Sequence, residues 1–346
     1  MKVKEKNTAA PESTLAASRG TQKMTATGFL LKYNCIIIFI ALFIVASCLS
    51  PMFCTPSNLF TMLRQQVPYL LIGMSMLIII ITGGIDLGAA SVAGVSSIVV
   101  AYAMINWGLS DGGFDTVLAV LLGVLMGAIF GAVNGFLVAK MRMPAFIVTL
   151  ATMTAGEGIG YIITKGNTLM LDNKSAGYEE LVGFSVNSIG PVPVAVIFVA
   201  VVIVIFFFIM KYTTFGRMVY AIGSNESAVQ LAGINSKKYL FLVYLIGGIL
   251  CGIAGVVITS RSGNASALTA GVDYPMTTIA GVVIGGASLA GGEGSVLLSV
   301  VGILIMAVIG NIMNLVNIAS YPQMVVKAVV IILAVVLKSF TSKKRG

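Results

Sequence analysis

Long apolar runs constrain this chain more than any other feature of its sequence. Residues 193–210, PVAVIFVAVVIVIFFFIM, contain no charged residue. A helix that crosses the hydrocarbon layer of a bilayer, about 30 Å thick, needs about 20 mostly apolar residues. Composition agrees, because 58% of the residues are hydrophobic and only 10% are charged, whereas a soluble domain is typically about 25% charged. We therefore expect an all-α polytopic membrane protein.

Ten such runs are candidate transmembrane spans, all within one membrane domain over residues 28–340. They cover residues 30–50, 68–83, 87–107, 116–139, 145–164, 190–210, 239–260, 272–290, 294–313 and 321–340. The flanking segments 1–27 and 341–346 are basic tails, and low hydrophobicity predicts that the first is disordered. An eight-span arrangement, with 68–107 or 272–313 as re-entrant pairs, is the alternative.

Basic residues indicate the orientation of the spans. If the N-terminus is cytoplasmic and the spans alternate, 16 of the 21 Lys and Arg residues lie inside, 4 lie outside and Lys327 lies within a span. Basic residues collect in the cytoplasmic loops of membrane proteins, so we expect ten spans with both termini in the cytoplasm. The same asymmetry explains the net charge of +9 without a nucleic-acid partner. Spans 2–5 and 7–10 are then arranged as inverted repeats would be.

One polar segment, the cytoplasmic loop 212–238, interrupts the apolar pattern. Within it Ser224 or Asn225 is placed to cap a helix over Glu226–Ala232, and Glu226 suits the positive end of the helix dipole. Gly233 is placed to end the helix in the left-handed conformation. A helix this short is unstable alone, so it packs either beneath its own bundle or against a cytoplasmic partner.

Several classes of catalytic motif are absent from the sequence. It contains no GxxxxGK[ST], HExxH or GxSxG motif, no CxxC pair and no histidine. We therefore expect no catalytic residue, no metal site and no nucleotide bound by this chain. If the protein is a pump, another subunit supplies the energy.

Six stretches resemble motifs of one known family, in the same order along the chain. They are SPMFCTPSNL, ITGGIDLGAASVAG, VNGFLVAKMRMPAFIVTLAT, FGRMVYAIGSNESAVQLAGI, VVIGGASLAGGEGS and SYPQMVVKAVVIILAV. Through them the chain from about Leu49 to Phe340 resembles the membrane subunits of bacterial ribose-type sugar ABC importers. The second motif departs from the family pattern, which usually continues with serine and a pair of small residues, whereas this chain reads Gly88-Ala89-Ala90-Ser91.

The resemblance implies a permease subunit that moves a ribose-like pentose or related monosaccharide across the bacterial inner or plasma membrane. It implies the larger, ten-helix permease fold. The implied partners are a cytoplasmic ABC ATPase that binds ATP and Mg²⁺, an extracytoplasmic sugar-binding protein, a second permease subunit (identical or paralogous) and membrane lipid. The residues that match the family's ATPase-coupling motif are Gly223, Asn225, Glu226, Ala228, Gly233 and Ile234.

Polar residues at membrane depth are candidates for the translocation path. Asp86 either lines the inner mouth or caps the helix that starts at Leu87. Glu157 lies mid-span among small residues and either faces the path or pairs with a basic residue across the subunits. Lys327 either extends toward the outer interface or pairs with an acid. Asn134 and Thr149 either hydrogen-bond a neutral sugar or bond their own backbone and neighbouring helices. An ion-coupled secondary transporter that uses Asp86 and Glu157 is the alternative function.

Overall fold

The computed structural model describes residues 26–267 and 273–343. The chain divides into two compact units, residues 1–34 and 35–346. The described part of the first unit is the beginning of α1 (Ala26–Leu49), so most of the predicted disordered tail 1–27 lies outside the described residues. Everything that follows concerns the second unit.

The second unit is almost entirely helical. Its further elements are α2 (Pro56–Ile81), α3 (Ala89–Asn106), α4 (Phe114–Gly135), the π-helix η1 (Phe136–Lys140), α5 (Ala145–Thr164), β1 (Leu169–Met170), α6 (Ala176–Val186), β2 (Ser188–Ile189), β3 (Val192–Pro193), α7 (Val194–Tyr212), α8 (Thr214–Leu231), α9 (Ser236–Ser262), β4 (Asn264–Ala265), α10 (Asp273–Ile284), α11 (Val296–Leu315) and α12 (Ser320–Lys343). Seven helices in the described chain are long and apolar enough to cross a membrane, and three shorter apolar helices lie in α1, α10 and α12. The expected all-α polytopic class is confirmed.

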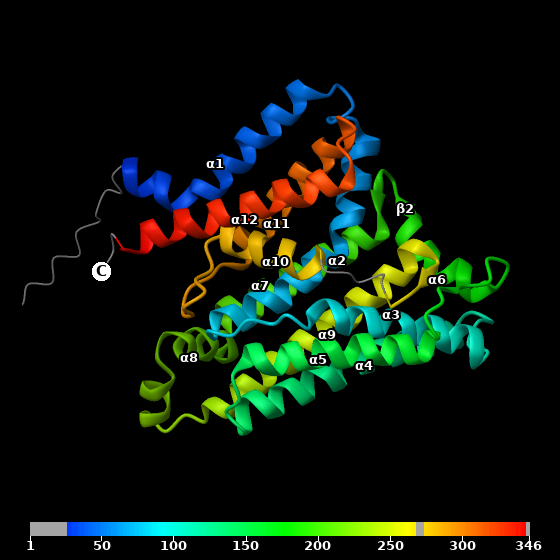
Figure 1. Ribbon diagram of the computed structural model, residues 1–346, viewed down its shortest axis with the longest axis horizontal. Coiled ribbons are helices and arrows are strands. Elements are labelled where there is room, and N and C mark those ends of the chain that lie inside the picture. The colour runs from blue at the N-terminus through cyan, green and yellow to red at the C-terminus, as the bar shows by residue number, and fades with distance from the viewer. Residues whose placement is uncertain (1–25, 268–272, 344–346) are drawn as a thin grey trace, which may run out of the picture. The chain divides into compact units, whose positions relative to one another are not determined.

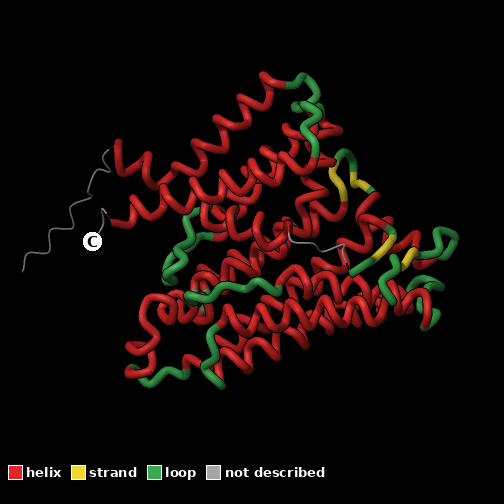
Figure 2. Tube along the Cα trace, in the orientation of Figure 1, coloured by secondary structure: helices red, strands yellow, loops and turns green. Residues whose placement is uncertain are grey.

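The strands are short and mark one end of the helices. β1 pairs antiparallel with β4, with Leu169 opposite Ala265, and β2 forms a hairpin with β3. Figure 2 shows these strands at the end away from α8, which Figure 1 labels.

Helix ends follow local signals that hydropathy does not capture. α2 begins at Pro56 rather than at residue 68, because the Thr55 side chain accepts a hydrogen bond from the Asn58 N–H, at 3.4 Å, and proline suits the first helical position. α10 ends at Ile284 rather than at residue 290. There Gly286 has a φ of 95°, which permits the left-handed turn that terminates the helix.

Glycines bring α4 and α9 into backbone contact. A side-chain carbon added at Gly127 would lie 2.4 Å from the Gly248 carbonyl oxygen, and one at Gly131 would lie 2.5 Å from that of Tyr244. Small residues that let backbones approach closely are typical of helix pairs in membranes. α3, α4, α5 and α9 lie side by side (Figure 1), while the buried core centres on α2, α3 and α9.

Candidate functional site

α8 carries the polar segment, and it consists of two helices rather than one. The backbone leaves helical geometry at Asn225, where φ is −162° and ψ is 95°. The Asn225 side-chain oxygen accepts a hydrogen bond from the Ala228 N–H, at 3.0 Å, so Asn225 caps the second helix as predicted. The first helix, residues 214–224, was not predicted. Its cap is Thr213, whose hydroxyl oxygen accepts from the Gly216 N–H at 3.3 Å.

The second helix of α8 ends in a Schellman motif. Gly233 has a φ of 78°, its N–H donates to the Gln230 carbonyl at 3.0 Å, and the Ile234 N–H donates to the Val229 carbonyl at 3.2 Å. These two bonds define the motif, so the predicted glycine stop is confirmed. Leu231, in the last turn, is 89% exposed. This short helix therefore has a fixed conformation and an uncovered apolar side chain.

Glu226 joins the second helix of α8 to the start of α9. Its Oε1 accepts hydrogen bonds from the Ser236 hydroxyl at 2.8 Å and from the Gln230 amide nitrogen at 2.7 Å. The same Gln230 nitrogen also donates to the Ser236 oxygen at 2.9 Å. Because Ser236 is buried, this network fixes the orientation of the second helix on the rest of the chain.

Gly223, at the end of the first helix of α8, lies directly on two other segments. A side-chain carbon there would lie 1.7 Å from the Ile81 carbonyl oxygen and 2.7 Å from the Gly292 nitrogen. The Gly292 N–H donates to that same Ile81 oxygen at 2.8 Å. We call this contact of Ile81, Gly223 and Gly292 the glycine junction. It joins α8 to the end of α2 and to the connector between α10 and α11.

Tyr220 of α8 forms a hydrogen bond next to the glycine junction. The Tyr220 hydroxyl donates to the Gly294 carbonyl at 2.9 Å, and burial raises the pKa of this phenol. Tyr220 therefore stays a neutral donor, and it ties α8 to the α10–α11 connector a second time.

The loop 82–88, between α2 and α3, is bonded to α5 by Thr149. The Thr149 hydroxyl accepts from the Leu87 N–H at 3.2 Å and lies 3.2 Å from the Ile85 carbonyl, to which it donates. Thr149 is fully buried. Its hydroxyl thus bonds the protein backbone, the second of the two roles considered for it.

Asp86 lies in the same loop but does not cap a helix that starts at Leu87. α3 begins at Ala89 rather than at Leu87, and its N-cap residue, Gly88, has no side chain that could cap it. Instead the Asp86 Oδ1 accepts a hydrogen bond from the Gly88 N–H at 2.8 Å, and the side chain is buried. The carboxylate therefore closes the turn that leads into α3, because the chain bends tightly there before the helix begins.

Glu157 lies on an open face of α5. Its side chain is exposed, and its Oε1 accepts a long hydrogen bond, 3.4 Å, from the Ser91 hydroxyl of α3. Beside it, a side-chain carbon added at Gly158 would meet nothing within 4 Å. A carboxylate in the middle of an apolar helix is costly against lipid, so this face requires water or another protein surface.

The remaining two path candidates lie on other helices. Asn134 of α4 is buried, and its side-chain oxygen has no hydrogen-bond partner within the part of the chain that the structure covers. Lys327 is half-buried on α12. The structure thus brings Thr149 to the loop of Asp86 and Glu157 to α3, while Asn134 and Lys327 stand on separate helices.

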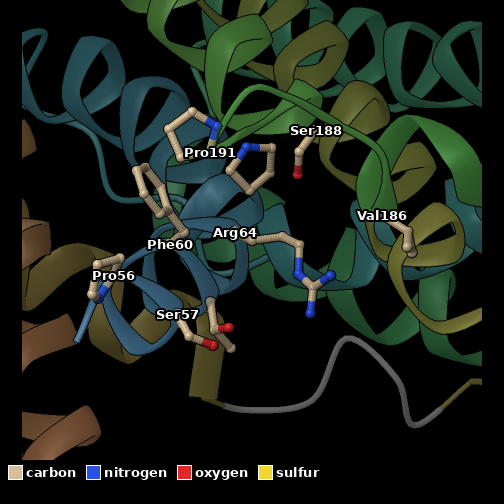
Figure 3. A pocket seen from close by; sticks show the side chains of 9 residues that line it. Pro56, Ser57, Phe60, Arg64, Val186, Ser188 and Pro191 are labelled. Atoms are coloured by element: carbon tan, nitrogen blue, oxygen red, sulfur yellow. The ribbon is translucent and has the colours of Figure 1, made fainter. Parts of the chain in front are cut away.

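A cavity of about 310 Å³ opens at the end of the helices opposite α8. It is lined by Pro56, Ser57, Phe60, Thr61, Arg64, Val186, Ser188, Pro191 and Pro193. Figure 3 shows the Arg64 guanidinium extending into the space between α2 and the β2–β3 hairpin. A second arginine, Arg261 of α9, donates to the Gln65 carbonyl at 3.3 Å. This end therefore offers cationic donors.

A second cavity, of about 230 Å³, lies on the side of α8. Glu226, the loop residues Gly83 and Gly84, and Arg142 after η1 contribute to its lining. Tyr244 also lines it, and its buried hydroxyl has no hydrogen-bond partner among the described residues. Across residues 26–267 and 273–343, no group of three His, Cys, Asp or Glu is arranged to hold a metal ion.

Sequence reasoning missed Arg64, Tyr220 and Ser236 as members of these sites. Ser236 had a local signal, since Asn235 caps α9 by accepting from the Lys238 N–H at 3.3 Å, and the residue after a cap begins a helix. Hydropathy predicts Arg64 in an outer loop, because it starts the second span at residue 68, whereas α2 starts at Pro56 and contains Arg64. Tyr220 had no signal, because its partner Gly294 is distant in sequence.

Comparisons with known proteins identify a family of permeases. The profile of the family described as branched-chain amino acid transport system / permease component matches residues 58–335. The ribose import permease protein RbsC of Bacillus subtilis is 38% identical over 302 residues, covering 86% of this chain and 91% of that protein. The D-allose transport system permease protein AlsC of Escherichia coli is 35% identical over 315 residues, covering 90% and 93%. No solved structure matches.

Proposed function

Because this chain belongs to the permease-component family of branched-chain amino acid transport systems, we propose that it is the membrane subunit of an ATP-driven ABC importer for a small sugar. It is a transport component rather than an enzyme. The names of its relatives, which include a ribose import permease and a D-allose permease, support a ribose-like pentose or related monosaccharide as cargo. They give no support to the ion-coupled alternative that uses Asp86 and Glu157.

The proposed topology has ten spans and cytoplasmic termini, in the bacterial inner or plasma membrane. Seven long apolar helices and three shorter ones support ten crossings. The concentration of lysine and arginine on one side supports the orientation. In this topology α8 is cytoplasmic, while α6 and the strands face outward.

The second helix of α8 is proposed to dock in a groove of a cytoplasmic ATPase, which binds ATP and Mg²⁺. The observation that carries this proposal is a short helix held rigidly at both ends, by Asn225 and by Gly233, with Leu231 left 89% exposed. A helix under two turns long is unstable by itself. Its fixed geometry, with an apolar side chain facing outward, suits transmission of force from a partner.

The exposed face of α5 is proposed to line the path together with a second permease subunit. Glu157 and the open space at Gly158 support this, since a mid-span carboxylate is favourable beside water or a partner and costly beside lipid. The purified complex should then contain two permease subunits and two ATPase subunits, which native mass spectrometry measures. A complex with one permease subunit would contradict it.

The cavity around Arg64 is proposed to receive the extracytoplasmic sugar-binding protein. It lies at the end opposite α8 and combines a guanidinium with serine and threonine hydroxyls. Guanidinium groups bind carboxylates with two parallel hydrogen bonds, so the matching surface of the partner is acidic.

Reconstitution tests the proposed function. Liposomes that contain the permease and its ATPase, with ATP inside and loaded binding protein outside, should accumulate labelled ribose. Replacing ATP with a non-hydrolysable analogue should abolish the uptake. Uptake driven by an ion gradient in the absence of ATPase would contradict the proposal.

A further inference from the structure

We propose that Thr149 is a positioning residue that transmits movement of α8 to α5 through the loop 82–88. The inference rests on the proposed function, because it concerns how an ATPase docked on α8 acts on the path beside α5. It depends on two contacts, which we call joints: the glycine junction at the start of the loop and the hydrogen bonds of Thr149 at its end.

The first joint is the glycine junction, at the start of the loop. Besides the contact of Gly223 with Ile81, a side-chain carbon added at Gly291 would lie 2.7 Å from the Gly223 oxygen and 3.1 Å from the Gly83 nitrogen. These contacts are between backbones, with no flexible side chain between them. Because packed interiors leave little free volume, α8 cannot move toward the loop without displacing it.

The second joint is Thr149, at the far end of the loop. Its hydroxyl accepts from the Leu87 N–H and lies within donating distance of the Ile85 carbonyl, both at 3.2 Å. The hydroxyl also lies 3.4 Å from the carbonyl oxygen of Phe146 in its own helix, which is a second acceptor for its proton. Buried backbone groups of a loop need such partners. A side-chain carbon at Gly88 would lie 2.9 Å from the Thr149 carbonyl oxygen, so the loop also lies against the α5 backbone.

Between the joints, the loop is held by its own hydrogen bonds. The Gly84 N–H donates to the Ile79 carbonyl at 3.0 Å, and the Asp86 carboxylate accepts from the Gly88 N–H at 2.8 Å. A short loop with bonds at both ends moves as a unit. Displacement at the glycine junction therefore reaches Thr149, and through it the helix that carries Glu157.

Thr149→Val tests the second joint, since valine keeps the shape of the side chain and removes the hydroxyl. The complete reconstituted complex should keep its ATPase subunits and its binding-protein-stimulated ATP hydrolysis. Sugar imported per ATP hydrolysed should fall by about fivefold or more, the usual lower bound for a coupling between two sites. Thr149→Ser, which keeps the hydroxyl, should restore the ratio.

Thr164→Val is the matched control on the same helix. Thr164 is also buried, and its hydroxyl donates to the Gly160 carbonyl of its own helix at 2.8 Å. This variant should import as much sugar per ATP as the wild type. If Thr149→Val does not fold, Gly88→Ala disturbs the same joint from the loop, and the same fall in sugar per ATP is expected.

Two results separate this inference from the proposed function. A normal ratio of sugar to ATP in Thr149→Val, or in Gly88→Ala, would overturn the role of Thr149 while leaving the importer intact. A wild-type complex that imports no sugar with ATP would overturn the proposed function, and the inference with it.

Discussion

Gly223 occupies a site where the packing has no room for one methyl group. A side-chain carbon there would lie 1.7 Å from the backbone oxygen of Ile81 and 2.7 Å from the backbone nitrogen of Gly292. Neither of these atoms belongs to a flexible side chain that could move away. Gly223→Ala should destabilise the fold by about 1–3 kcal/mol, the usual cost of overpacking, and should lower uptake. The midpoint of thermal unfolding in detergent measures the first effect.

Gly310→Ala is the control for that experiment. A side-chain carbon at Gly310 would meet nothing within 4 Å, and alanine favours a helix over glycine by up to about 1 kcal/mol. The unfolding midpoint of this variant should therefore equal or exceed that of the wild type. Equal midpoints for Gly223→Ala and Gly310→Ala would show that the glycine junction yields easily.

Glu180 of α6 makes the contact between α6 and the start of α4 dependent on pH. Its two carboxylate oxygens accept from the Gly113 N–H at 2.9 and 2.8 Å, and this hydrogen bonding lowers the pKa of the carboxyl. The pKa of Glu180 in the unfolded chain is therefore higher than its pKa in the folded protein. The stabilising contact is fully present above the unfolded pKa, near 4.3, and is lost as the pH falls through the lower folded pKa.

Hydrogen exchange measures this prediction at the Gly113 amide. Its protection factor should be constant near pH 7 and should fall in acid as Glu180 takes up a proton. Glu180→Gln should remove the pH dependence, whereas Glu179→Gln, a neighbouring exposed carboxylate on α6, should retain it. The same pH dependence of protection in the wild type and in Glu180→Gln would refute the prediction.

Single residues were predictable where their partners are close in sequence. Asn225 and Gly233 act on atoms within a few residues, so capping rules predicted both conformations. The hydroxyl of Thr149 bonds Leu87, 62 residues away, and nothing near Thr149 in the sequence indicates that contact. The path roles of Asn134, Glu157 and Lys327 stay predictions for the same reason.

Among whole elements, apolar spans were predicted better than polar helices. The span over residues 145–164 coincides with α5, because a run of about 20 mostly apolar residues has a single interpretation. The first helix of α8 and all of α6 were missed, since hydropathy is silent about polar helices. For α6 a local signal existed, because Ser175 caps it by accepting from the Tyr178 N–H at 3.2 Å.

The second helix of α8 should lose its shape in Gly233→Val. A β-branched residue at a φ of 78° is strained by about 1–3 kcal/mol. Because the segment lies outside the bilayer in the proposed topology, membrane insertion should persist. ATPase docking should weaken, uptake should fall and binding protein should no longer stimulate ATP hydrolysis, all measured in liposomes at matched permease level.

Gly166→Val is the control for Gly233→Val, because it introduces the same backbone strain at the end of the helices opposite α8. Gly166 also has a φ of 78°, and a side-chain carbon there would meet nothing within 4 Å, but it follows α5 on the proposed outer side. This variant should keep full ATPase stimulation. Normal uptake and stimulation in Gly233→Val would mean that the segment is only an interfacial loop.

For the whole molecule, composition was sufficient to predict the class but not the number of crossings. A 58% hydrophobic chain leaves few alternatives to membrane helices. Span edges depend on caps and glycine turns, and on whether the 12-residue α10 crosses fully, which hydropathy cannot decide. The orientation rests on charge counts and is open to direct measurement.

Cysteine labelling measures the orientation. The exposed Cys48 and Cys54 are first replaced by serine, and Lys343→Cys then marks the C-terminus. In intact cells an impermeant maleimide should label this position only after permeabilisation, whereas Asp111→Cys, in a predicted outer loop, should react at once. Ready labelling of position 343 from outside would exclude ten spans with cytoplasmic termini.

The glycine contact between α4 and α9 has a genetic consequence. Every amino acid that one base change can substitute for glycine carries a side-chain carbon. At Gly127, Gly131 and Gly248 that carbon would lie between 2.3 and 2.5 Å from a backbone oxygen of the facing helix. No single base change that alters the amino acid at these positions is therefore conservative. In a library of single-nucleotide variants selected for transport, missense variants should be depleted at these positions, which recur about one helical turn apart along α4.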